Sequence, residues 1–154
     1  MPIIEIAISC EGFPLYKRIW TGHPVEIDDD DAISAALHML FYSIEKKFIP
    51  DAQSNTVLKL DMDSHYMHMM KILLEPTPDG FSRDLYVYII EDSNLDKRIS
   101  TTFMKKVLDA FVKSYKDRID SMLKESINLP EFDVVVDKLV SGMQKKKKKS
   151  APEI

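Results

Sequence analysis

The chain has 154 residues, enough for one domain with a sizeable apolar core, so its folding requires no disulfide or metal. Hydrophobic residues make up 45% of the sequence, and no apolar run approaches the ~20 residues that cross a bilayer. The formal net charge is −4, but five of the 21 basic side chains are the lysines at positions 145–149, so the rest of the chain is more strongly acidic. An acidic body is poorly suited to nucleic acid, and we expect no nucleic-acid partner.

The beginning of the chain does not have the pattern of a signal peptide. Its first five residues place the carboxylate of Glu5 among apolar side chains and contain no basic residue. We therefore expect a cytoplasmic protein, with association at the periphery of membranes as a further option. The single cysteine, Cys10, cannot form an internal disulfide, and its place in a predicted strand favours a buried structural side chain over a nucleophile.

Alternating apolar residues predict a β-hairpin over residues 3–20. Glu11-Gly12 supplies its turn, and Phe13 begins the returning strand. Pro14 has no N–H to donate, so the returning strand should lie at the edge of a sheet. In the first strand, one face is expected to carry Ile4, Ile6 and Ile8, and the other Ile3 and Ala7.

A helix is predicted from about Asp31 to Phe48. Its apolar residues recur at helical spacing, and residues 28–31 supply N-caps and negative charge at the positive end of the helix dipole. We interpret this acidic run as a helix start, because no glycine follows to bend it into a calcium loop.

Three more strands are expected after Pro50. Residues 56–62 and 65–74 form a second hairpin, and residues 84–91 form a fifth strand. The fourth and fifth strands are apolar on both faces, whereas an antiparallel sheet normally leaves one face polar. We therefore expect the 31–48 helix on one face of the sheet and a helix over residues 100–127 on the other.

The end of the chain predicts two helices and a tail. Pro130 ends the 100–127 helix, and a last amphipathic helix follows. The expected organisation is a domain over residues 1–128, a C-terminal amphipathic helix over residues 129–144 and a disordered basic tail over residues 145–154.

Catalytic and metal-binding patterns are missing from the sequence. His65 and His68 lie near two aspartates, but positions three apart on a strand point to opposite faces and cannot bind one ion without a bulge. The chain has no glycine-rich phosphate loop, nucleophile elbow or zinc-protease helix. We therefore expect a protein that is not an enzyme, with no catalytic residues, no metal and no cofactor.

The expected order of elements is β-β-α-β-β-β-α-α, an α+β fold with a five-stranded antiparallel sheet sandwiched between helices. This longin/profilin-like order resembles the longin domain over roughly residues 3–125. The opening segment carries the resemblance, with an apolar strand, a glycine turn and a return strand of apolar, aromatic and basic residues: Ile3-Ile4-Glu5-Ile6-Ala7-Ile8-Ser9-Cys10-Glu11-Gly12-Phe13-Pro14-Leu15-Tyr16-Lys17-Arg18.

The resemblance implies a non-enzymatic protein-interaction module in intracellular membrane trafficking or small-GTPase regulation. Longin domains occur in longin-type SNAREs, adaptor subunits, transport-complex subunits and exchange factors for small GTPases. Because about 30 residues follow the 100–127 helix, we expect neither a SNARE heptad region nor a membrane anchor. The length is more similar to that of an adaptor small subunit or a transport-complex subunit.

The implied partner is a small GTPase or another longin-type or roadblock-type subunit, with a homodimer as a further arrangement. We place the contact on the return strand, because an edge strand can pair with an added strand and because Tyr16, Arg18 and Trp20 share one face. The alternative is that the protein's own helices cover these aromatic side chains. The predicted partner-binding residues are Phe13, Leu15, Tyr16, Lys17, Arg18 and Trp20.

The lysine run predicts weak contact with anionic membranes, because each basic residue near such a surface contributes ~1 kcal/mol. A solubilising tail is the alternative. The predicted membrane-surface residues are Lys145, Lys146, Lys147, Lys148 and Lys149.

A second functional class also fits the predicted fold, namely a profilin-like or PAS-like sensor that binds a ligand or a partner. Such a domain needs an internal cavity of a few hundred Å³ with convergent polar groups. The apolar side chains expected on both faces of the sheet favour the interaction module.

Overall fold

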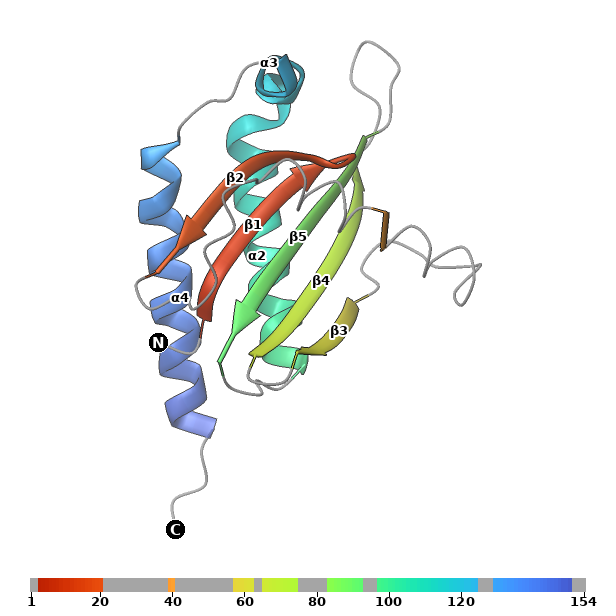
Figure 1. The fold of residues 1–154 in the computed structure, drawn as a ribbon. Helices are drawn as coiled ribbons and strands as arrows, with labels where there is room; N and C mark the ends of the chain where they lie inside the picture. Colours follow the sequence, from red (N-terminus) through yellow and green to blue (C-terminus); the bar gives the residue numbers. More distant parts are fainter. Residues whose placement is uncertain are drawn as a thin grey trace.

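The computed structural model describes residues 3–20, 39–40, 57–62, 65–74, 83–92, 97–124 and 129–150. Within them, five strands form one antiparallel sheet in the order β2-β1-β5-β4-β3 (Figure 1). The predicted five-stranded antiparallel sheet is therefore confirmed. Its strands are β1 (Ile3–Cys10), β2 (Phe13–Ile19), β3 (Val57–Met62), β4 (His65–Leu74) and β5 (Arg83–Glu91).

The hairpin of β1 and β2 has the two-residue turn that the sequence predicted. Glu11 has φ 50° and Gly12 has φ 92°, and a two-residue turn of this kind needs positive φ at its central positions. The backbone N–H of Glu11 also donates to the carbonyl of Asp84, which ties the turn to the start of β5.

The two long C-terminal helices pack on the same side of this sheet. Figure 1 shows α2 (Lys97–Tyr115) behind the sheet and α4 (Pro130–Ser150) beside it, next to β2. Between them come a 3₁₀ turn, η1 (Lys116–Arg118), and the short helix α3 (Ile119–Lys124).

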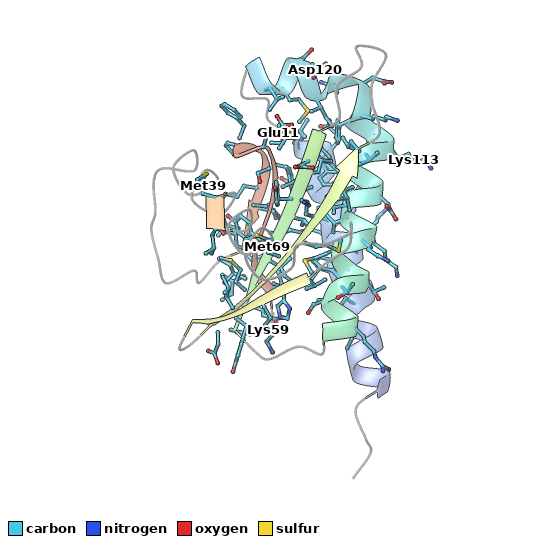
Figure 2. All side chains as sticks on the ribbon, turned by 90° about the vertical axis from the view of Figure 1, so that its right-hand side faces the viewer. Glu11, Met39, Lys59, Met69, Lys113 and Asp120 are labelled. Carbon is cyan, nitrogen blue, oxygen red and sulfur yellow. The ribbon has the colours of Figure 1, made fainter. Side chains whose placement is uncertain are left out.

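The single helix expected over residues 100–127 is thus divided. Tyr115 has non-helical backbone angles, φ −127° and ψ 4°, so the chain changes direction there. This turn allows α3 to contact β2 while Ile119 and Met122 remain buried. Figure 2 places Glu11 of the hairpin turn and Asp120 of α3 at the same end of the molecule.

The last helix extends further than the sequence led us to expect. We placed the start of a disordered tail at residue 145, whereas α4 continues in helical conformation to Ser150. Lysine is a good helix former, and cations near the C-terminus of a helix interact favourably with its dipole. The lysine run therefore prolongs the helix.

Most of the predicted 31–48 helix lies outside the described residues. Met39 and Leu40, which the structure does describe, are helical. Figure 2 places Met39 on the side of the sheet opposite to α2.

Both faces of the central strands are buried, as their two-sided apolarity indicated. The larger cluster lies between the sheet, α2 and α4 and includes Val87, Phe111 and Phe132. A smaller cluster on the other face consists of Ala7, Met67, Met69, Tyr86 and Tyr88, with Leu60 and Ile90 packed against it.

One face assignment in β1 was wrong. Ile3 packs in the larger cluster with Ile6 and Ile8, although simple alternation placed it with Ala7. The pairing of β1 with β5 shifts register between Ile3 and Glu5. Such a bulge adds one residue to a strand and reverses the face of every residue beyond it.

A histidine and a carboxylate are buried together at one end of the larger cluster. Nε2 of His68 in β4 lies 2.5 Å from Oε1 of Glu91 in β5, and both side chains are 0% exposed. The sequence indicated a structural or surface role for His68 but gave no sign of Glu91 as its partner.

We predict that His68→Leu lowers the free energy of unfolding by about 3–5 kcal/mol, because it leaves the carboxyl group of Glu91 buried without its histidine. Adding Glu91→Gln should recover part of this loss, since a neutral amide is cheaper to bury than a charge. Urea denaturation followed by circular dichroism measures both values. Equal stability of the single and double variants would contradict this explanation of the loss.

Candidate interaction surface

The strand β2 forms one edge of the sheet. It pairs with β1, and its other edge pairs with no strand in the described part of the chain. An edge strand presents backbone N–H and C=O groups that can bind an added strand. The position of β2 therefore agrees with the edge location that Pro14 indicated.

A bulge decides which side chains of β2 face the helices. Ile8 pairs with Tyr16, but Ser9 pairs with Pro14, so Leu15 is the extra residue on β2. Leu15 and Tyr16 are both buried, with 5% and 7% of their surfaces exposed, and both belong to the larger cluster. Beyond the bulge, Tyr16, Arg18 and Trp20 share one face, as the sequence predicted.

Tyr16 is covered by α4. Its ring meets Phe132 edge-on, with centroids 4.8 Å apart and an interplanar angle of 87°. Phe132 also contacts Phe111 and Tyr115 of α2, at centroid distances of 5.5 and 5.7 Å. The Tyr16 hydroxyl donates a hydrogen bond of 2.5 Å to Oδ1 of Asp133. This aromatic group joins β2, α2 and α4.

Arg18 binds the same part of α4. Its guanidinium nitrogens lie 3.7 Å from Oδ2 of Asp133 and 3.1 Å from Oδ2 of Asp137, two carboxylates one helical turn apart. The guanidinium also lies 5.6 Å from the centre of the Trp20 ring. Because these charges are partly exposed, each pair contributes ~1 kcal/mol or less. Their main effect is to fix the register of α4 on β2.

A second phenol holds the beginning of α4. The Tyr115 hydroxyl donates a 3.0 Å hydrogen bond to Oε1 of Glu131. Burial, followed by this hydrogen bond, raises the pKa of Tyr115 to about 12. Burial and then the bond to Asp133 raise the pKa of Tyr16 far above the usual range of a phenol. Hydrogen bonds from its own backbone and from Tyr115 lower the pKa of Glu131.

The remaining predicted residues of β2 are divided between different environments. Lys17 points to the face of the sheet opposite to Tyr16, and its Nζ lies 3.5 Å from Oε1 of Glu5. Phe13, at the start of β2, is 58% exposed, and Ile19, at its end, is 48% exposed. Tyr16 is thus covered by the protein's own helix, which was the alternative reading, while the two ends of β2 remain exposed.

Sequence reasoning missed the residues of α4 that meet β2. The sequence predicted an amphipathic helix there but no contact for Glu131, Asp133 or Asp137. The spacing of Asp133 and Asp137, four residues apart, was a usable signal, because it puts both carboxylates on one face of a helix, within reach of the same guanidinium. Nothing in the sequence indicated which arginine would bind them.

The described residues contain no group of three or more His, Cys, Asp or Glu side chains placed to hold a metal ion. Among the same residues, no helix has both the length and the apolar character required to cross a bilayer. His68 has its Nε2 against Glu91, and the side chain of His65 lies outside the described part.

We predict that Asp133→Ala lowers the free energy of unfolding by about 1–3 kcal/mol, because it leaves the buried Tyr16 hydroxyl without its acceptor. Chemical denaturation measures the change. Val134→Ala is the matched control, since Val134 is 57% exposed on the same helix and its replacement should change stability by less than ~0.5 kcal/mol. Similar losses in both variants would contradict the role of Asp133.

We also predict that the docking of α4 weakens as the pH rises from about 10 to about 12. Tyr115 keeps its proton in the folded protein up to about pH 12, whereas its unfolded pKa is 10.0, so the folded state binds more protons in this range and loses stability with rising pH. Unfolding free energies at several alkaline pH values test this. Because lysines also titrate there, the comparison is with Tyr16→Phe/Tyr115→Phe, whose stability should fall less steeply.

Comparison with protein-family models matches residues 31–136 to Longin, described as a regulated-SNARE-like domain. A comparison with curated proteins found no match. The matched range begins after the hairpin of β1 and β2, which the structure nevertheless joins to the same sheet. Longin domains are non-catalytic interaction modules typical of trafficking proteins. Since the match spans more than half of the chain, this protein belongs to the longin family.

Proposed function

We propose that this longin protein is a non-enzymatic module that binds a small GTPase or another longin-type or roadblock-type subunit in membrane trafficking or small-GTPase regulation. The observation that carries the proposal is the β2 edge. Its outer backbone pairs with no described strand, and exposed apolar side chains, Phe13 and Ile19, stand at its two ends.

The geometry favours addition of a partner strand to β2. In this mode backbone hydrogen bonds supply affinity, and side chains near the ends of the strand supply specificity. The bonds of Arg18 to Asp133 and Asp137 hold β2 and α4 together, so the edge is supported from one side before a partner arrives. A preorganised edge lowers the entropic cost of binding.

A second copy of the chain is a further candidate partner at the same edge. Two β2 strands related by a two-fold axis would pair antiparallel and extend the sheet. This arrangement uses the same residues, so the test must distinguish the two partners.

The sensor alternative receives less support. Phe111, Phe132 and Met104 are among the largest fully buried side chains, and they fill the space between the sheet, α2 and α4. A domain that enclosed a ligand there would need a cavity in place of these side chains.

The test begins with affinity purification of the intact protein from its own cells, with mass spectrometry to identify any small GTPase or longin-type subunit. Binding of that partner is then measured with Phe13→Asp/Ile19→Asp. We predict a loss of affinity of at least tenfold, because charges at apolar interface positions typically cost more than 1 kcal/mol each. Lys113→Asp is the control, since Figure 2 places Lys113 on the outer side of α2.

Analytical ultracentrifugation of the unaltered chain distinguishes the homodimer. A dimer that dissociates in Phe13→Asp/Ile19→Asp, with no heterologous partner recovered, assigns the edge to a second copy. Undiminished binding of the recovered partner to this variant would rule out the β2 edge as the interface.

A further inference from the structure

A groove of about 250 Å³ lies between the first half of α2 and the middle of α4. The two helices run in opposite directions, so the beginning of α2 and the end of α4 meet at the same end of the molecule (Figure 1). None of the residues that line the groove takes part in the contacts of Tyr16 and Arg18, which involve Asp133 and Asp137.

Apolar side chains form the floor of the groove. Phe103 and Met143 are buried there, and Ile99 and Leu139 are half-buried. The wall of the groove has free space at Gly142, because a Cβ added at this position would meet no surrounding atom within 4 Å. An apolar concave surface of this kind takes an apolar segment of a ligand.

Basic side chains surround this floor. Arg98 and Lys106 come from α2, Lys138 comes from α4, and all three are exposed. None of the lining residues is acidic, although the chain as a whole carries a net charge of −4. The rim thus concentrates positive charge on an acidic protein, which favours an anionic ligand.

The lysine run extends the same positive end. Residues 145–150 continue α4 directly from the groove. The sequence thus places five further positive charges directly after the groove, at positions 145–149. A run of basic residues of this kind favours an anionic membrane surface, where each basic residue contributes ~1 kcal/mol.

We propose that this groove binds an anionic phospholipid of a membrane surface, with the phosphate at Arg98, Lys106 and Lys138 and part of an acyl chain against Phe103 and Met143. The volume of about 250 Å³ is below the ~300–1,000 Å³ of sites that enclose a whole small ligand. The ligand therefore inserts one segment and stays anchored elsewhere, as a lipid in a bilayer does. The proposal does not depend on the β2 edge, which uses different residues.

The first test is cosedimentation of the full chain with phosphatidylcholine vesicles that contain or lack phosphatidylserine. Lys106→Gln/Lys138→Gln should lower the partition coefficient by about fivefold per charge removed. The matched control is Lys105→Gln/Lys113→Gln, which removes two exposed charges from α2 outside the groove. Equal losses in the two variants would overturn the proposal, since only net charge would then matter.

The second test fills the groove. Gly142→Leu should reduce binding of phosphatidylserine vesicles severalfold, whereas Gly142→Ala should leave it unchanged. Both substitutions replace a helical glycine and should favour the helix, so a loss confined to leucine reports occupancy of the groove. Vesicle binding by Gly142→Leu equal to that of the unaltered chain would overturn the proposal.

The third test separates the groove from the lysine run. Dihexanoyl phosphatidylserine, used below its micelle concentration, should shift the methyl resonances of Leu139 and Met143, and glycerophosphoserine should not. A chain that ends at Gln144 should retain these shifts while binding vesicles more weakly. Absence of the shifts, or their appearance with an acidic amphipathic peptide but not with the lipid, would exclude a lipid site.

Discussion

The packing of α4 against β2 and α2 is the contact on which the rest of the structure depends. Phe132 is 1% exposed and lies at the centre of an aromatic group with Tyr16, Phe111 and Tyr115. Burial of one such side chain contributes about 1.5–3 kcal/mol. The hydrogen bond from Tyr16 to Asp133 joins positions separated by 117 residues. Loop-closure entropy grows slowly with length, so this burial can hold together the two ends of the domain.

This contact gives the two halves of α4 different roles. The first half is acidic, and Glu131, Asp133 and Asp137 bind the chain's own phenols and arginine. From Lys138 onward the charged residues of α4 are basic, and Lys138 lines the groove together with Arg98 and Lys106 of α2. The helix α4 therefore completes the core of a longin domain and has its basic residues toward its C-terminus. Position along α4 decides whether a charge acts within the domain or at its surface.

Much of the local structure could be predicted from the sequence. The alternation of Ile4, Ile6 and Ile8 and the Glu11-Gly12 turn specify a hairpin, because side-chain period and turn chemistry act over a few residues. Local rules were wrong about Ile3 and about the helix break at Tyr115. A bulge depends on the register of two strands, and a helix break depends on what the following residues must bury. Both are set by contacts between distant parts of the chain.

The sequence by itself determined the fold class, the antiparallel strands and the resemblance to the longin family, since these follow from periodicity and element order. Only the tertiary structure decided the strand order β2-β1-β5-β4-β3, the burial of His68 with Glu91 and the covering of Tyr16 by α4. An amphipathic helix and an aromatic strand each show a binding face in the sequence. Whether such faces meet one another or a partner depends on the path of the chain in space, which no local pattern encodes.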